Sequence, residues 1–296
     1  MSIKKNMRIA LVSALLCAGC SSDVEDVVAE TVSSGEKMTA TAAAETGKGR
    51  IEVTEFTGEE EQEDIEIKHV SGTTYEGWIM FVHDPEDVTV EVNPYLGSGS
   101  AAPSLDTYVD VYNAVAGINA GGFEDVGGNG NGSIPQGIVI HDGELLYGSL
   151  NHYSEVIGID ENNRLICAGA TAQDCLDWGI KEAVTFGPVL ISNYEDVFDR
   201  SYSNLRVLNP RSAIGQTTDG TFLLVVLDGR GPSSFGAKYE DVVNLFLEYD
   251  TVNAANLDGG NSTAMIYEGE YVNNTVSMYG SRNLPTVFLV KEGEGE

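Results

Sequence analysis

Positive charge is scarce in this sequence, and the scarcity excludes two classes of partner. The 296 residues contain 16 Lys and Arg against 46 Asp and Glu, which gives a formal net charge of -30. Binding of nucleic acid requires clustered Lys and Arg side chains that neutralise phosphates. Electrostatic adhesion to an anionic membrane surface requires the same positive charge. The composition therefore argues against nucleic acid as a partner and against adhesion to such a surface through charge.

Cysteine is also rare: the chain has four, and two of them lie beyond the N-terminal segment. Cys167 and Cys175 have no histidine beside them, so they do not make a zinc site. In an exported protein, two cysteines this close favour a disulfide that closes a small loop. Two free thiols beneath a surface loop are nearly as well supported by the sequence.

Long apolar runs are missing, and the longest candidate is the short one at the N-terminus. The start MSIKKNMRIALVSALLCAGC has a basic beginning and an apolar core that is too short to span a bilayer. This pattern is typical of an export signal. LCAGC resembles a bacterial lipobox that ends at a lipid-accepting Cys20, although Cys17 stands where such signals usually carry Leu.

Residues 1–20 are therefore predicted to be a lipoprotein signal peptide. Several acyl chains on Cys20 would give stable anchoring to the bacterial cell membrane. Cleavage by an ordinary signal peptidase, without lipidation, is the alternative and would release an extracellular protein.

Composition divides the rest of the chain into three parts. Residues 21–73 are rich in Glu, Asp, Thr, Ala and Ser and include TGEEEQEDIEIK, so a solvated, disordered acidic tether is expected. Residues 74–291 carry the apolar patterning of a folded domain. Residues 292–296 are a short acidic tail.

Strand patterns dominate the predicted domain. GIVIHDGELLYG predicts a hairpin, because alternating apolar residues flank Asp142 and Gly143, a favoured type I′ turn pair. Helical spacing occurs in SLDTYVDVYNAV, with Ser104 as N-cap, and in YEDVVNLFLEYD. We expect a single α+β domain built on a strand-rich mixed or antiparallel sheet with a few helices.

Four clusters place polar groups at the ends of apolar strands, next to glycine or proline. They are NAGGF at residues 119–123, NPRSAIG at 209–215, LDGRG at 227–231 and LDGGNSTAM at 257–265. Glycine allows close approach of backbone, and loops at strand ends are where rigid scaffolds present functional groups. Any one cluster is most simply a tight turn, but four in one domain predict a site. The two that contain Gly-Gly each follow a helix and a short strand, which predicts two glycine corners side by side.

In this order, the clusters resemble the motifs of the phosphodiester glycosidase family. PQGIVIHDGEL and FGPVLIS also fit the family pattern, and the resemblance runs over residues 77–290. Its departures from the pattern are Ala120, Glu124, Ser212 and Asn261. The resemblance implies an exported hydrolase that cleaves a sugar-1-phosphate diester in envelope or extracellular glycans. A sugar-phosphate diester or glycopolymer is then the expected partner.

Cleavage at the sugar carbon develops positive charge on the ring and negative charge on the departing phosphate. A carboxylate can stabilise the ring, and an arginine can hold the phosphate with two hydrogen bonds. Within this family interpretation, Asp258 is expected to act as nucleophile, base or electrostatic stabiliser. Arg211, which Pro210 stiffens, is the preferred clamp, and Arg230 is the second candidate, with a structural role as its alternative. Candidate substrate-binding residues are Asn119, Gly121, Gly122, Asp228, Arg230, Gly259, Gly260, Ser262 and Thr263.

Alternatives stay open for several of these residues. Arg211 could instead be the buried ion-pair partner of Asp228 or Asp258, and Asp258 could cap the turn that follows it. A second catalytic acid, if the reaction uses one, could be Asp228 or Glu124. The four histidines are scattered without the spacing of a metal pair, so no metal or other cofactor is predicted.

Two rival functions fit the same residues. One is a phosphodiesterase that breaks the P–O bond, and the other is a non-catalytic glycan-binding or exopolysaccharide-assembly protein of the cell surface. The sugar, the polymer, the stereochemical outcome and the oligomeric state are not determined by the sequence.

Overall fold

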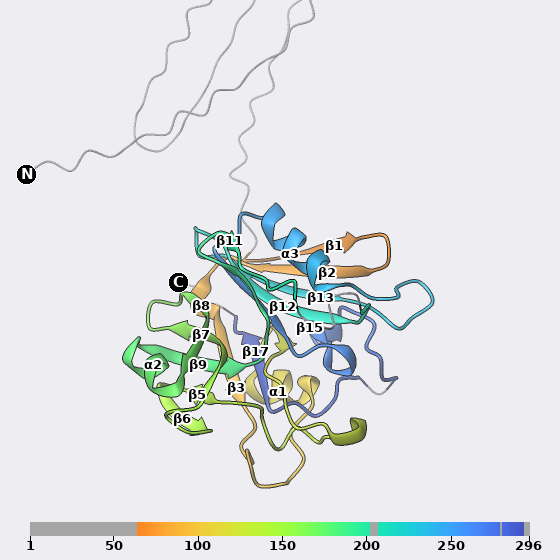
Figure 1. Cartoon of the computed structure of the whole chain (residues 1–296). Helices are drawn as coiled ribbons and strands as arrows, with labels where there is room; N and C mark the ends of the chain where they lie inside the picture. The colour runs from red at the N-terminus through yellow and green to blue at the C-terminus, as the bar shows by residue number, and fades with distance from the viewer. Residues whose placement is uncertain (1–63, 202–206, 279, 293–296) are drawn as a thin grey trace, which may run out of the picture. The chain divides into compact units, whose positions relative to one another are not determined.

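Three antiparallel sheets form the part of the chain that the computed structural model describes, residues 64–201, 207–278 and 280–292 (Figure 1). Strands of the first sheet are, in spatial order, β1 (Ile65–Ser71), β2 (Glu76–Val82), β13 (Phe222–Leu227), β12 (Arg211–Gln216), β14 (Asn253–Leu257), β10 (Val189–Ser192) and β11 (Glu195–Asp196). Those of the second are β16 (Glu270–Tyr271), β15 (Met265–Tyr267), β4 (Ala116–Asn119), β17 (Thr286–Val290) and β3 (Val88–Val92). Those of the third are β6 (Glu144–Tyr147), β5 (Val139–His141), β9 (Ile180–Thr185), β7 (Tyr153–Asp160) and β8 (Leu165–Thr171).

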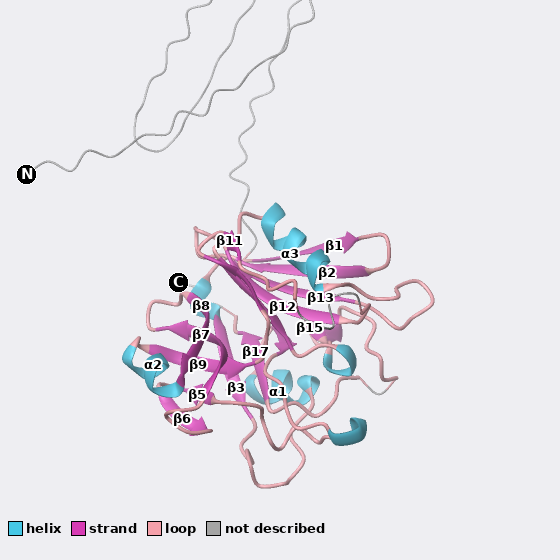
Figure 2. Ribbon diagram, viewed as in Figure 1, coloured by secondary structure: helices cyan, strands magenta, loops and turns pink. Residues whose placement is uncertain are grey.

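Each sheet carries an α-helix on its outer face (Figure 2). The helices are α3 (Tyr239–Glu248) on the first sheet, α1 (Leu105–Tyr112) on the second and α2 (Ala172–Asp177) on the third. Short 3-10 turns occur at Pro85–Asp87, Val126–Gly128 and Gly260–Ser262. The predicted strand-rich α+β domain is confirmed. Among the described residues, no helix is long and apolar enough to cross a membrane.

The inner faces of the three sheets meet in one hydrophobic core. Val226 of the first sheet, Ile118 of the second and Ile157 of the third belong to the same buried cluster. The continuous apolar run of β13 contributes to the hydrophobic clusters on both sides of the first sheet, because successive side chains of a strand point to opposite faces. Its residues Phe222, Leu224 and Val226 enter this central core, whereas Leu223, Val225 and Leu227 pack beneath α3.

Within the described residues, regular structure starts at Ile65, before the predicted domain boundary at residue 74. β1 lies inside the segment predicted as tether and pairs along its whole length with β2. Ile65 and Ile67 alternate with charged residues and pack against the central core. The charged residues of this strand, Glu66 and Lys68, therefore lie on the opposite face from Ile65 and Ile67. Residues 1–63, which include the predicted signal peptide and Cys20, and most of the predicted tail lie outside the described residues.

Cys167 and Cys175 are both buried and both free, so the predicted disulfide is absent and the free-thiol alternative holds. Cys167 on β8 faces the central core, whereas Cys175 on α2 packs on the outer side of the same sheet. The sheet itself therefore separates the two sulfur atoms. Burial raises the pKa of Cys175 to about 11, so its thiol is poorly reactive at neutral pH.

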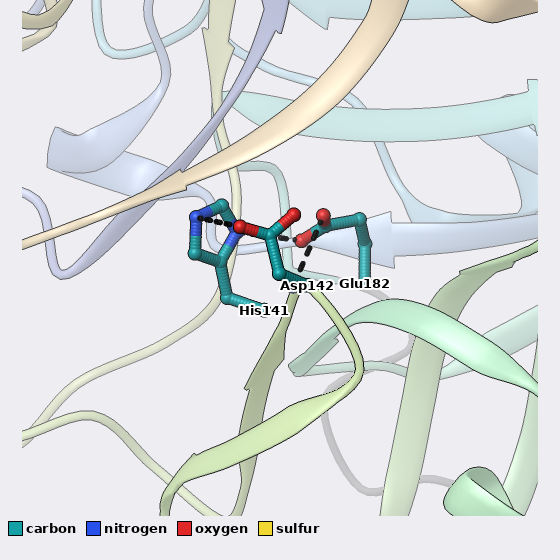
Figure 3. Close-up of side chains that lie close together, drawn as sticks. All are labelled: His141, Asp142 and Glu182. Atoms are coloured by element: carbon teal, nitrogen blue, oxygen red, sulfur yellow. Dashed lines mark hydrogen bonds and ion pairs between the residues drawn. The ribbon is translucent and has the colours of Figure 1, made fainter.

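The predicted hairpin connects β5 to β6, with φ of 51° at Asp142 and 74° at Gly143. Beside the turn, His141 Nδ1 lies 2.9 Å from Glu182 Oε2 and Nε2 lies 3.7 Å from Asp142 Oδ2 (Figure 3). The ligand atoms of these three residues lie within 4.8 Å of one another, close enough to share a divalent cation. The expectation of no metal site therefore stays a prediction.

The His141–Glu182 pair should make stability depend on pH. The hydrogen bond to Glu182, aided by the charges of Asp142 and Glu91, raises the pKa of His141 above its ordinary value. For a raised histidine pKa, the stabilisation is fully present below about pH 6.5 and is lost as pH rises through the folded-state pKa.

We expect His141→Gln to lower the free energy of unfolding by roughly 0.5–1 kcal/mol at pH 6 and by much less at pH 9. Urea denaturation at the two pH values measures this difference, with the exposed His152→Gln as control. An equal loss at both pH values would contradict the assignment.

Candidate active site

The predicted motifs meet because antiparallel strands place the end of one strand beside the start of its neighbour. In the first sheet, Ser212 at the start of β12 pairs with Leu257 at the end of β14. In the second sheet, Asn119 at the end of β4 pairs with Val287 near the start of β17. The loops that leave these strand ends therefore gather at one rim.

The two predicted glycine corners, residues 120–122 and 258–260, do lie side by side. The Asp258 N–H donates to the Ala120 carbonyl at 3.0 Å. The first corner also reaches the other two sheets: the Gly121 N–H donates to Thr286 Oγ1 and the Gly122 N–H donates to the Thr185 carbonyl, both at 3.0 Å. Residues 120–122 thus contact all three sheets.

Those contacts correct the role expected for Gly121 and Gly122, which was to present backbone N–H groups to a ligand. Both N–H groups are used inside the fold. Glycine is needed at position 122 for space, because a Cβ there would lie 2.6 Å from the Phe186 ring. The first corner therefore builds the wall of the site and does not hold the substrate.

Asn119 likewise holds the fold together. Its side chain is fully buried. Its Nδ2 donates to the Asp258 carbonyl at 2.5 Å, and its Oδ1 accepts from the Ser212 hydroxyl at 2.7 Å and the Ala264 N–H at 3.2 Å. With these bonds made, no part of Asn119 faces a ligand. The predicted substrate-binding residue is instead a positioning residue for Asp258.

The rim encloses a cavity of about 270 Å³. Of the predicted residues, those that line it are Arg230, Asp258, Gly259, Gly260 and Ser262. The remaining lining residues are Phe123, Asp125, Gln136, Phe186, Asn261 and Arg282. Two aromatic rings, two carboxylates, two guanidinium groups and two amides thus face one space. Apolar walls with a few convergent polar groups are typical of small-molecule sites.

Asp258 is the half-buried carboxylate of this cavity. Burial raises the pKa of Asp258 to about 6, against the hydrogen bond from Ser262, the positive charge of Arg282 and the Gly259 N–H, which all favour the ionised form. A carboxyl group with this pKa is mostly ionised at neutral pH and is still basic enough to accept a proton. It suits a base or a nucleophile.

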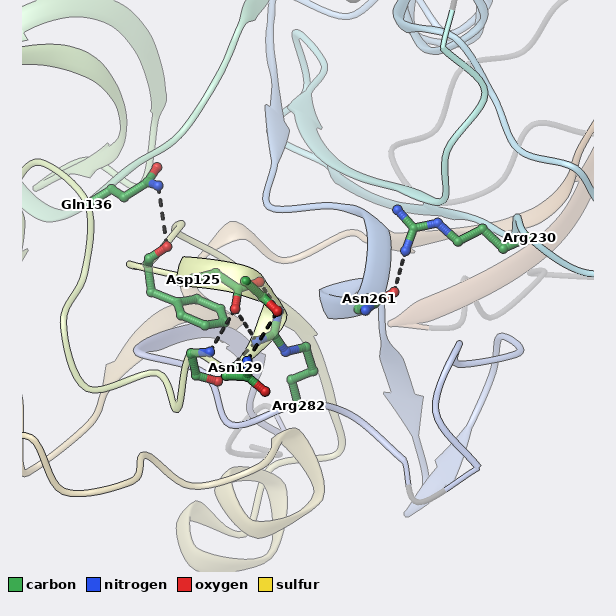
Figure 4. A network of polar contacts seen from close by, with 9 residues as sticks. Asp125, Asn129, Gln136, Arg230, Asn261 and Arg282 are labelled. Atoms are coloured by element: carbon green, nitrogen blue, oxygen red, sulfur yellow. Dashed lines mark hydrogen bonds and ion pairs between the residues drawn. The ribbon is translucent and has the colours of Figure 1, made fainter.

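Arg230 lies across the cavity on a loop after β13 and donates to the side-chain oxygens of Asn261 and Asn209, the latter at 2.9 Å (Figure 4). Both partners are neutral amides, so its guanidinium has no carboxylate partner among the described residues. Gly260 has a φ of 61°, and a Cβ there would lie 3.2 Å from Arg230 Nη2. The motif glycine therefore makes room for this guanidinium.

Arg282 is the second cation of the cavity, but its charge is already paired. Its two terminal nitrogens donate to the two oxygens of Asp125 at 2.7 and 2.9 Å, and Nη2 also donates to the Gly130 carbonyl (Figure 4). The guanidinium lies 4.8 Å from the Phe123 ring centre. Arg282 lowers the pKa of Asp125 to about 2. The pair is a fixed ionic wall of the cavity.

Arg211, the preferred clamp from the sequence, does not line the cavity. Its buried side chain donates to the carbonyls of Ala237 and Val207, both at 3.1 Å, and lies 3.9 Å from the Tyr239 ring centre. Because β12 begins here with its backbone against the second corner, the side chain turns away toward the segment before α3. The alternative ion pair with Asp228 or Asp258 is not formed either.

Asp228 and Thr263 are also outside the cavity lining. Asp228 is 4% exposed and accepts hydrogen bonds from Asn273 Nδ2 and from the N–H and Nδ2 of Asn274. It therefore fixes the loop after β16 and is neither a substrate ligand nor a free acid. Thr263 is 2% exposed. Glu124, the other candidate acid, lines a neighbouring cavity.

Most of the residues that sequence reasoning missed have a signal in the quoted motifs. Phe123 ends NAGGF, Gln136 lies in PQG, Phe186 precedes GP, and Asn261 follows LDGG. In these motifs the neighbouring glycines and charged residues give the stronger sequence signal. Arg282 and Asp125 stand in no comparable pattern, because the ion pair links residues 157 positions apart.

Comparison with known proteins gives the family. The family model described as phosphodiester glycosidase matches residues 112–291. The chain belongs to the phosphodiester glycosidase family. Membership of this family supports a glycosidase, and thus a hydrolase, as the activity class.

One relative is the SPbeta prophage-derived uncharacterized protein YomE of Bacillus subtilis, 29% identical over 202 residues. That alignment covers 66% of this chain and 30% of the relative, so the chain spans less than a third of that protein.

Two solved structures have a fold similar to that of this chain. The catalytic domain of zebrafish N-acetylglucosamine-1-phosphodiester alpha-N-acetylglucosaminidase, auto-inhibited by its pro-peptide, has a TM-score of 0.64 at 21% identity over 77% of this chain and 82% of its own. A hypothetical protein from Synechocystis has a TM-score of 0.55 at 16% identity over 77% of this chain and 62% of its own.

Asn119→Ala should destabilise the protein strongly. The substitution leaves the Ser212 hydroxyl, the Ala264 N–H and the Asp258 carbonyl without their partner, so we expect a loss of about 2–4 kcal/mol in the free energy of unfolding. Asn261→Ala is the matched control, because that amide is exposed, and it should change stability by less than about 0.5 kcal/mol. Denaturant titration measures both, and equal effects would contradict the positioning role.

Proposed function

We propose that this protein hydrolyses the glycosidic bond of a sugar-1-phosphate diester. The observation that carries the proposal is one cavity that combines the carboxylate of Asp258 with an Arg230 guanidinium that no carboxylate of the described residues neutralises. The family membership supports the same class of reaction. No cofactor is part of the proposal.

Arg230 is the group best suited to hold the phosphate. A guanidinium can give two parallel hydrogen bonds to a phosphodiester, and amide partners leave its charge available. Asn261 and Asn209 fix its orientation. Phe123 and Phe186 line the same cavity and offer apolar surface to the sugar ring.

Asp258 is proposed to act in its ionised form at the anomeric carbon. The C1–O bond to phosphate breaks, and its electron pair leaves with the phosphate. Asp258 stabilises the positive ring, bonds to C1 for one step, or takes the proton of the attacking water. Water supplies the new hydroxyl on C1, and its proton ends on the phosphomonoester or the solvent. A phosphate needs little protonation to leave, so a second acid is not required.

The cellular setting is also proposed, on the N-terminal sequence alone. The predicted export signal and the predicted lipidation at Cys20 favour a lipid-anchored or extracellular protein that meets envelope or extracellular glycans. An acidic protein repels an anionic diester at long range. Screening over roughly 8–10 Å at physiological salt lets Arg230 dominate inside the cavity.

Substitutions at the two proposed groups test the function on a chromogenic sugar-1-phosphate diester. Asp258→Asn should lower kcat by at least about a hundred-fold, and Arg230→Ala should lower kcat/KM by about 10²–10³-fold, with partial recovery in Arg230→Lys. Arg200→Ala removes an exposed arginine that pairs with Asp196, and it should leave both constants unchanged. Unaltered activity in Asp258→Asn would remove the basis of the proposal.

Solvent labelling separates the proposed reaction from cleavage of P–O. In ¹⁸O water, breakage of the C1–O bond places the label in the sugar product, and breakage of the P–O bond places it in the phosphate product. Mass spectrometry of the two products decides between them.

The pH profile tests the protonation state of Asp258. Because burial raises the pKa of this carboxyl to about 6, an ionised catalytic form predicts that kcat/KM falls about tenfold per pH unit below pH 6 and is level above it. A profile that instead declines as pH rises through 6 would show that the protonated carboxyl is the active form.

A further inference from the structure

A second cavity adjoins the candidate active site at Gln136, which lines both. Its volume is about 640 Å³, larger than the first cavity of about 270 Å³. Beyond Gln136, its walls come from Glu124, from Leu146 and Tyr147 at the end of β6, and from Ser149 and His152 of the β6–β7 connection. The function proposed above leaves this space unused.

The wall between the cavities is a short two-stranded ribbon. Phe123 pairs with Pro135, the Gln136 N–H donates to the Gly122 carbonyl at 2.9 Å, and the Glu124 N–H donates to Ile134 at 2.8 Å. Successive residues of an extended segment face opposite ways, and so Phe123 lines the first cavity while Glu124 lines the second. The ribbon is thus a shared rim that one extended ligand could cross at Gln136.

The lining chemistry of the second cavity points to an uncharged ligand. No Lys or Arg of the described part of the chain lines it, and Glu124 adds negative charge, so a phosphate would find no Lys or Arg partner among those residues. Tyr147 and Leu146 offer apolar surface. Ser149, His152 and Glu124 offer donors and acceptors for hydroxyl groups. This mixture of ring faces and short polar groups suits neutral sugar units.

The position of the second cavity relative to Arg230 indicates whether the phosphate side or the sugar side of the substrate would enter it. Arg230 and Gln136 lie on opposite sides of the first cavity's polar network (Figure 4). With the phosphate at Arg230, the sugar extends toward Gln136. The second cavity therefore lies beyond the sugar, on the side away from the phosphate.

We propose that the second cavity binds further neutral sugar units joined to the sugar whose anomeric carbon is attacked. The substrate would then be an oligosaccharyl-1-phosphate diester, and the first cavity alone would hold a monosaccharide more weakly. This inference rests on the proposed function for the position of the phosphate.

Three substrates with the same phosphate ester, carrying one, two or three sugars, test the proposal. We expect kcat/KM to rise at least about tenfold from one sugar to three, since binding energy remote from the reacting bond can be used in catalysis. Ser149→Trp, which fills the second cavity from an exposed position, should abolish that gain and leave the monosaccharide rate unchanged. Leu146→Ala should reduce the gain.

Leu150→Ala is the matched control. Leu150 is 44% exposed and Leu146 is 47% exposed. Leu146 lies in β6 and Leu150 in the connection that follows it, and of the two Leu146 lines the cavity. Equal rates for one and three sugars in the natural protein would overturn the proposal. A gain that survives Ser149→Trp, or that Leu150→Ala removes equally, would overturn it too.

Failure of the proposed function gives a different result. If none of the three substrates is turned over, the catalytic proposal fails, and calorimetry with a neutral trisaccharide then decides the question of the second cavity. Binding that Ser149→Trp weakens and Leu150→Ala does not would support a glycan subsite. No measurable binding would overturn it.

Discussion

The buried amide of Asn119 is the interaction on which the site depends. One side chain joins the end of β4 to the Asp258 carbonyl, to Ser212 of β12 and to the Ala264 N–H before β15. Because β4 belongs to the second sheet and Asp258 follows a strand of the first, these bonds fix one sheet rim against the other. Inside a core, each unpaired partner would cost a large part of the net stability of a domain. The fold thus holds the carboxylate in place before any ligand arrives.

The arginines near this rim differ in the groups that their side chains contact, and these contacts decide which guanidinium can bind an anion. Arg211 is buried among carbonyls and against an aromatic ring. Arg282 is neutralised by Asp125 in a bidentate pair. Arg230 contacts neutral amides, and so its charge is the one that can act on an anion. In a chain with a net charge of -30, such a local arrangement is what makes an anionic substrate plausible.

The motif glycines serve mainly to let chains approach closely. At Gly122 a side chain would strike Phe186, and at Gly259 it would lie 2.9 Å from the Pro210 carbonyl. Only Gly259 and Gly260 also line the cavity, while Gly121 and Gly122 support its wall. Within one motif, some residues therefore form the surface of the cavity, and others hold that surface in position. The same division separates Ser262, which lines the cavity, from its neighbour Thr263, which does not.

The sequence by itself determined the strand-rich α+β fold, the hairpin at Asp142 and Gly143, and the motif that contains Asp258. These follow from near neighbours in the chain: alternation, turn residues and helical spacing. Tertiary structure alone decided that Arg211 turns from the cavity, that a sheet separates Cys167 from Cys175, and that Arg282 meets Asp125. Such outcomes depend on contacts between residues as far apart as 157 positions and on the face to which each strand-end side chain points. No pattern among neighbouring residues encodes these long-range contacts or the direction of a strand-end side chain.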